Sequence, residues 1–209
     1  MTISARIPQV VVFDLGKVLV DFDYSIAGRH IAARSDLSPA EVQALIDHSP
    51  LLYRFETGLM SKQEFFEAVR STTGFRGGLD EFTSFFADIF FPMPAMIELH
   101  AQLRTRGVPT FIFSNTNELA VGHIRRNFPF FAHFTDYIFS YEHGAMKPEA
   151  RLYEVVEART GRRGTDILYL DDRVENVEAG AKRGWQVILQ ETPEKSWSAM
   201  RQHGLITDA

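Results

Sequence analysis

The sequence predicts an α/β fold: a doubly wound parallel sheet that carries a helical insert after its first strand. Short apolar runs without polar alternation indicate strands that are buried on both faces. Between the later runs lie helical patterns that close on glycine, a common stop signal. About ninety residues separate the first run from the second, far more than one crossover helix requires.

The expected elements follow one another as strand, helix and strand, which is typical of a parallel sheet wrapped by helices. We expect strands at 10–13, 110–113, 137–139, 167–170 and 186–189. Helices are expected at 94–106, 148–160 and 174–183, each followed by a glycine. The core domain is therefore assigned to residues 1–23 and 91–209.

Residues 24–90 are assigned to the helical insert, which forms a cap over the edge of the sheet. Ser38 with Glu41 and Ser61 with Glu64 are capping boxes that mark two helix starts. Farther along, aromatic and aliphatic residues recur at helical spacing, and core packing is the favoured interpretation of this stripe. Its members are Phe82, Phe85, Phe86, Ile89 and Phe90.

Composition and charge exclude several classes of function. The 209 residues include 22 Lys and Arg against 27 Asp and Glu, a net charge of −5, so a nucleic-acid partner is not expected. No apolar run approaches the length of a membrane span, and a membrane partner is not expected either. Cysteine is absent, which removes disulfides and thiolate chemistry. The first residues lack a signal-peptide core, so a cytoplasmic location is expected.

Polar residues stand at the carboxyl ends of expected strands, where open parallel sheets bind ligands. Asp14, Ser114 and the pair Asp171-Asp172 follow three strands directly, and Lys147 precedes a helix. Each alone has an ordinary reading as a helix cap or a surface charge. Together they place three carboxylates at one rim, where two carboxylates ~4 Å apart repel by about 4 kcal/mol at an effective dielectric near 20. Such a cluster needs a shared cation or proton.

The available donors favour a hard cation such as Mg²⁺, because they are oxygens and no suitably spaced histidine pair is present. Lys147 adds a positive charge, while Ser114 and the Asn115 amide add hydrogen-bond donors. These residues would form an anion-binding site next to a metal ion and opposite a carboxylate. Such an arrangement favours phosphoryl transfer by a nucleophilic aspartate.

The order of these motifs resembles the haloacid dehalogenase (HAD) superfamily, whose core is Rossmann-like, and the insert falls where that family carries a helical C1-type cap. The resemblance covers nearly the whole chain. The amino-acid sequences of four motifs are similar to those of a phosphatase branch of this superfamily. The motifs are Phe13–Val18, Ser114–Asn117, Lys147–Tyr153 and Asp171-Asp172. That branch includes α-D-glucose-1-phosphate phosphatases and, more distantly, the N-terminal phosphatase domain of soluble epoxide hydrolases.

The resemblance implies that Asp14 is the nucleophile and becomes an aspartyl phosphate. It also implies that the Asp14 carboxylate, the backbone carbonyl of Gly16 and the Asp172 carboxylate hold Mg²⁺. Asp171 falls on a glycine of the family pattern and is expected to act indirectly or through water. Asn176 stands where the family has its second acid and could support the ion.

The same resemblance assigns the phosphoryl oxygens to Ser114 and the Asn115 amide, and the neutralising charge to Lys147. It implies Mg²⁺-dependent hydrolysis of a small phosphomonoester, such as the sugar phosphate glucose 1-phosphate. The protein is expected to be a monomer or a homodimer.

Gly16 departs from the pattern, because most phosphatases of this superfamily carry a second aspartate there as general acid and base. Such help is worth about 10²- to 10⁴-fold in rate. Three explanations for the missing aspartate stay open. The first is that the substrate needs less acid catalysis, because a sugar 1-phosphate leaves as a relatively acidic hemiacetal hydroxyl. The second is that another residue acts as general acid, for which Asp21, Asp23 and His143 are the available candidates.

The third explanation is a different activity. A 2-haloacid dehalogenase releases halide, which needs no proton, but these enzymes use no metal and the acid pair Asp171-Asp172 speaks against this alternative. A catalytically idle protein that binds a phospho-ligand is the remaining hypothesis.

Residues of the insert are expected to set specificity. Tyr53, Arg54 and Glu56 precede Gly58 in an expected turn and are the candidates for contact with the leaving group. Arg29 and Arg34 are weaker candidates, for which ordinary surface charge is the favoured reading.

Overall fold

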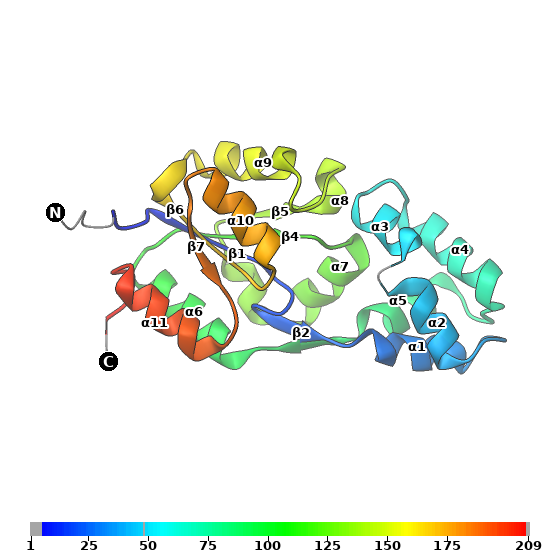
Figure 1. Ribbon diagram of the computed structural model, residues 1–209. Helices are drawn as coiled ribbons and strands as arrows, with labels where there is room; N and C mark the ends of the chain where they lie inside the picture. Colours follow the sequence, from blue (N-terminus) through cyan, green and yellow to red (C-terminus); the bar gives the residue numbers. More distant parts are fainter. Residues whose placement is uncertain (1–5, 48, 208–209) are drawn as a thin grey trace.

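A five-stranded parallel sheet forms the centre of the molecule (Figure 1). In this computed structural model, which describes residues 6–47 and 49–207, the strand order is β5-β4-β1-β6-β7. The expected lack of a leader concerns residues 1–5, which lie outside the described residues. The doubly wound parallel sheet predicted from the sequence is confirmed. Its strands are β1 (Val10–Phe13), β4 (Thr110–Ser114), β5 (Asp136–Phe139), β6 (Ile167–Asp171) and β7 (Gln186–Leu189).

Both faces of the central strand are covered, which explains why its sequence shows no polar alternation. Val11 and Phe13 belong to the hydrophobic cluster on one face, together with residues of α6, α7 and α11. Val10 and Val12 belong to the cluster on the other face, with α9 and α10. These helices are α6 (Pro94–Thr105), α7 (Glu118–Asn127), α9 (Ala150–Thr160), α10 (Val174–Lys182) and α11 (Pro193–Gln202).

Shorter helices complete the connections of the core. They are α8 (Ser140–His143) and two 3₁₀ turns, η1 (Pro129–His133) and η2 (Gly164–Asp166). Within the described residues, no helix combines the length and the hydropathy that a bilayer crossing would need.

The direction in which the chain winds reverses beside β1. After β1 the chain builds β4 and β5 on one side, and then returns to place β6 and β7 on the other. Strands β1 and β6 pair directly, with Phe13 opposite Leu170. Their carboxyl ends therefore border the crevice where sheets of this kind bind ligands.

In its described residues the insert has five helices, and two short strands join it to the core (Figure 1). Strands β2 (Val20–Phe22) and β3 (Phe90–Pro92) pair antiparallel to each other. Both capping boxes predicted from the sequence are formed, at Ser38 and Ser61. The helices are α1 (Tyr24–Ala32), α2 (Pro39–Ile46), α3 (Pro50–Glu56), α4 (Lys62–Thr73) and α5 (Leu79–Ala87).

Stacked phenylalanines fill the interior of the insert. The rings of Phe55 and Phe65 are parallel with centroids 4.4 Å apart, and the Phe86 ring meets Phe65 edge-on at 5.1 Å. Phe82 and Phe86 are buried within the chain, which agrees with the packing interpretation of the aromatic stripe.

Two helix boundaries predicted from the sequence are wrong. The helix expected from Pro148 begins at Ala150, because Glu149 has an extended backbone and cannot belong to it. The aromatic stripe does not continue on one helix, since α5 ends at Ala87. Beyond it Phe90 pairs with β2 as part of β3.

Replacing a central ring of the insert should destabilise the protein far more than replacing an exposed one. We expect Phe65→Ala, at a fully buried position, to lower the free energy of unfolding by about 3–5 kcal/mol. Phe91→Ala is the matched control because half of Phe91 is exposed, and it should cost about 0.5 kcal/mol or less. Urea denaturation measures both, and equal losses would contradict the assignment of the insert's core.

Candidate active site

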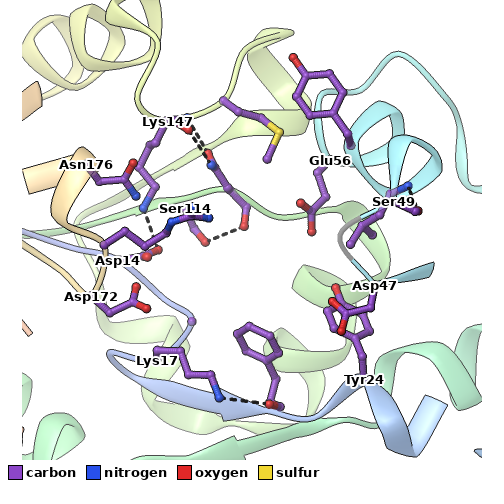
Figure 2. Close-up of a pocket in the computed structure, with 17 residues that line it drawn as sticks. Asp14, Lys17, Tyr24, Asp47, Ser49, Glu56, Ser114, Lys147, Asp172 and Asn176 are labelled. Carbon is purple, nitrogen blue, oxygen red and sulfur yellow. Dashed lines mark hydrogen bonds and ion pairs between the residues drawn. The ribbon is translucent and has the colours of Figure 1, made fainter. Parts of the chain in front are cut away.

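Four segments of the core bring the polar residues predicted from the sequence to one place (Figure 2). Asp14 follows β1, Ser114 ends β4, Lys147 lies in the loop before α9, and Asp171 ends β6. One carboxylate oxygen from each of Asp14, Asp171 and Asp172 lies within 4.8 Å of the others. The expected convergence of three acids and an ammonium is therefore present.

The buried ammonium of Lys147 lies between two of these acids. Its Nζ is 3.0 Å from Asp14 Oδ1 and 2.6 Å from Asp171 Oδ2, and it also donates to the Phe113 carbonyl oxygen at 3.0 Å. Only 1% of the Lys147 side chain is exposed. Burial alone would lower the pKa of Lys147, but the two carboxylates outweigh it and raise the pKa, so the lysine stays charged.

Asp171 has no oxygen left for further ligands. Its Oδ2 accepts from Lys147 and from the Tyr169 hydroxyl, and its Oδ1 accepts from the Arg173 backbone N–H at 2.9 Å and from Asn176 Nδ2 at 3.0 Å. Burial by itself raises the pKa of Asp171, yet the Lys147 ammonium and these donors bring it below the usual value. Asp171 is therefore an ionised partner that positions Lys147.

At Asp14 and Asp172 the surroundings disfavour the ionised form of the carboxyl group. Burial raises the pKa of Asp14 to about 8 against the opposing effect of Lys147, and the Asp171 charge adds to the increase. Burial, followed by the charge of Asp171, also raises the pKa of Asp172. A cation between these two acids would relieve both effects, and carboxylate oxygens with the nearby Gly16 carbonyl are a donor set that suits Mg²⁺.

The loop after β4 supports Lys147 from the other side. The Asn115 side chain donates to the Lys147 carbonyl oxygen at 3.1 Å and accepts from the Lys147 backbone N–H at 2.8 Å. Ser114 lies beside it, with its hydroxyl 3.3 Å from the Asn115 carbonyl oxygen. Sequence reasoning assigned only the backbone amide of Asn115 to the site and missed this support, for which the sequence carries no local signal.

Phe22 fills the space beside Gly16. A Cβ atom at Gly16 would stand 2.9 Å from Phe22 Cε1, too close for any side chain unless the ring moves. Lys17 follows in a left-handed conformation and its Nζ lies 4.7 Å from the centre of the same ring. The same ammonium is paired with Asp21. The absence of an acid at Gly16 is thus built into the packing of this turn.

A cavity of about 530 Å³ separates the acid cluster from the insert. Figure 2 shows Asp47 and Glu56 on the insert side, facing Asp14 and Asp172 of the core. The described residues that the insert contributes to the wall are Tyr24, Asp47, Ser49, Leu52, Tyr53 and Glu56.

Of the insert residues predicted from the sequence, only Tyr53 and Glu56 line this cavity. Tyr24, Asp47 and Ser49 were missed. For Ser49 a signal was available, since Ser49-Pro50 is a helix start, and the Ser49 hydroxyl accepts from the Leu52 N–H at 3.0 Å.

The other candidates lie outside the cavity wall. Asp23 caps α1 by accepting from the Ser25 N–H at 2.8 Å, and Arg34 pairs with Glu81. These residues therefore have structural or surface roles in this arrangement. The set outside the wall is Asp21, Asp23, Arg29, Arg34, Arg54 and His143.

The family model of haloacid dehalogenase-like hydrolases matches residues 8–184. The chain belongs to this family. Among solved structures, a HAD-family enzyme from Bacteroides thetaiotaomicron has a TM-score of 0.80 at 19% identity, covering 93% of this chain and 98% of that one. That enzyme has also been solved in complex with magnesium and inorganic phosphate.

Two further structures share the HAD fold. A HAD-like hydrolase from Porphyromonas gingivalis has a TM-score of 0.78 at 19% identity and covers 93% of this chain and 98% of that one. An L-2-haloacid dehalogenase from Xanthobacter autotrophicus has a TM-score of 0.62 at 18% identity and covers 92% of this chain and 88% of that one.

Asp171→Asn tests whether Asp171 serves the lysine or a metal. Loss of the ionised partner of buried Lys147 should lower the free energy of unfolding of the metal-free protein by about 3–5 kcal/mol. Asp136→Asn, which breaks the surface pair with Arg159, should cost at most about 1 kcal/mol. Urea titration in the presence of a chelator is the measurement. If Asp171 mainly repelled its neighbours, Asp171→Asn would instead stabilise the protein.

Proposed function

We propose that this HAD-family hydrolase is an Mg²⁺-dependent phosphomonoester hydrolase that works through an aspartyl phosphate. The observation that carries the proposal is the charge arrangement around Lys147. The ammonium is held by Asp171 and touches Asp14, so it stands where it can offset negative charge on an attacking carboxylate and on a phosphoryl group. Asp14 and Asp172 together then offer two carboxylates to a divalent cation.

In the first step a carboxylate oxygen of Asp14 attacks phosphorus and the bond to the leaving oxygen breaks. Lys147 stabilises the charge on the transferring group, and the Ser114 hydroxyl and Asn115 amide donate to its oxygens. Mg²⁺, held by Asp14, Asp172 and the Gly16 carbonyl, would neutralise phosphoryl charge in the same place.

In the second step water attacks the aspartyl phosphate, which regenerates Asp14 and releases inorganic phosphate. The insert limits the access of bulk water while the first step takes place. Its contact with the core includes a hydrogen bond from the Lys62 backbone N–H to Glu118 Oε1 at 3.0 Å.

The cavity suits a small leaving group rich in hydroxyls, such as the sugar of glucose 1-phosphate. Its volume of about 530 Å³ falls in the range of small-molecule sites. Tyr24, Asp47 and Ser49 give its outer wall hydroxyl and carboxylate groups that can exchange hydrogen bonds with sugar hydroxyls.

A dehalogenase is the second candidate, since L-2-haloacid dehalogenases share the fold. The charge of the wall argues against this activity. A 2-haloacid is a carboxylate and its leaving group is an anion, yet the described residues that the insert contributes include two acids, Asp47 and Glu56, and no cation. Along this described part of the wall, the insert therefore offers no positive charge to either the carboxylate or the leaving halide.

Phosphate release from p-nitrophenyl phosphate and glucose 1-phosphate, with and without Mg²⁺, tests the proposal. We expect Mg²⁺-dependent release that Asp14→Asn lowers by about 10⁴-fold or more, because the nucleophile is lost. Asp21→Asn, at an exposed position outside the cavity, should behave as the unchanged protein.

Other outcomes of this assay would overturn the proposal. Chloride release from a 2-chloro acid without metal would indicate the dehalogenase. Binding of Mg²⁺ without turnover of either phosphate ester would indicate a protein that only binds a phospho-ligand.

A further inference from the structure

A second, smaller cavity adjoins Gly16, at the point where most phosphatases of this family place their general acid. Its volume of about 60 Å³ is roughly that of two water molecules. Glu56, Gly16 and Ser114 line both this cavity and the larger one. Figure 2 shows the Glu56 carboxyl group pointing into the space between the insert and the core. An acid of the insert and the position that lacks an acid in the core therefore border the same small cavity.

Glu56 is fastened to the loop that follows β4. Its carbonyl oxygen accepts from the Ser140 hydroxyl at 2.5 Å, and that hydroxyl oxygen accepts from the Thr116 N–H at 2.9 Å. The Asn117 side chain lies near enough to the Glu56 carboxyl group to act as a donor that lowers its pKa. Since Asn117 Oδ1 accepts from the Ala120 N–H at 3.0 Å, the amide NH₂ is the group available to Glu56. Although Glu56 belongs to the insert, its position is thus set by the core.

The Glu56 carboxyl group can change protonation state near neutral pH. Burial raises its pKa to about 7, the negative charge of Asp47 adds to the increase, and the Asn117 hydrogen bond opposes it. The other titratable or charged groups that line the same cavity come from both sides of it. They are Tyr24 and Tyr53 of the insert and Asp14, Lys17, Lys147, Asp172 and Arg173 of the core. A group that must first give and then take a proton works best when its pKa lies close to the working pH.

The remaining described groups fit this task less well. Burial raises the pKa of Tyr24 well above its usual value, so this hydroxyl cannot take a proton from water. Asp47 lines the larger cavity but not the small one beside Gly16. Asp21, Asp23 and His143, the candidates from the sequence, line neither.

We propose that Glu56 is the general acid and base of the reaction, supplied by the insert in place of the side chain absent at Gly16. The inference rests on the proposed phosphatase function. In the first step the bond between phosphorus and the leaving oxygen breaks as neutral Glu56 gives its proton to that oxygen, and the alcohol leaves. In the second step the Glu56 carboxylate takes a proton from water, whose oxygen bonds to phosphorus as the bond to Asp14 breaks. Glu56 is then neutral again.

Glu56→Gln, compared between two leaving groups, is the main test. The amide keeps an acceptor for Asn117 but cannot give a proton. In single turnovers with Mg²⁺, transfer from glucose 1-phosphate should fall by about 10²- to 10⁴-fold. Transfer from p-nitrophenyl phosphate should fall less than about tenfold, since its phenolate leaves without a proton. Because the second step also lacks its base, p-nitrophenolate should appear as a burst equal to the enzyme concentration.

The control is Glu67→Gln, the same chemical change on α4, where Glu67 pairs with Arg70 and lies outside both cavities. It should leave both rates unchanged. Equal losses for the two esters in Glu56→Gln, or no loss, would overturn the role of Glu56. Failure of the proposed function is distinct, because the unmodified protein would then show no Mg²⁺-dependent transfer that requires Asp14.

Asn117→Asp provides a second variant that does not change Glu56. An aspartate can still cap α7 by accepting from the Ala120 N–H, but it loses the amide donor and adds a negative charge beside Glu56. The transfer rate from glucose 1-phosphate should fall as pH rises through about 7 in the unmodified protein, because Glu56 loses its proton there. In Asn117→Asp this decline should move to higher pH. An unmoved profile would contradict the proposal.

Discussion

The arrangement of the site depends on the buried ion pairs that Lys147 forms with Asp171 and Asp14. The Lys147 ammonium is buried away from water, and the cost of this desolvation is offset by its ion pairs with Asp171 and Asp14. Asp171 in turn is held by hydrogen bonds from Tyr169, Asn176 and the backbone of Arg173, so the carboxylate that pairs with the lysine is fixed in place. This leaves Asp14 in a position where it is near a positive charge and still has an oxygen facing the cavity.

The insert completes the site from the opposite side. Phe22, at the end of the strand that leads into it, packs against Gly16, and its ring would have to move to admit a side chain there. The helix that follows later, α3, ends at Glu56 beside the loop after β4. Phe22 thus occupies the space beside Gly16, and Glu56 brings a carboxyl group to the small cavity that both residues line.

Local patterns in the sequence were sufficient for the sheet and for the convergence of Asp14, Ser114, Lys147 and Asp171-Asp172. Each apolar run is a strand of the sheet, and Asp14, Ser114 and the pair Asp171-Asp172 stand at or directly after strand ends, while Lys147 lies in the loop before α9. Asp47 and Tyr24 could not be predicted in this way, because their place in the wall depends on how five short helices pack around stacked phenylalanines. The hydrogen bonds that occupy Asp171 likewise involve side chains whose orientation no local pattern reveals.

The hydroxyl of Ser140 joins the end of α3 to the loop after β4. It therefore links the position of the insert to the position of the Glu56 carboxyl group. An acid carried at position 16 would belong to the core and would not depend on the insert. Under the proposed mechanism the proton carrier is instead Glu56, whose place depends on the contact between insert and core that Ser140 helps to form. Hydrolysis of a phosphorylated Asp14 would then require that contact.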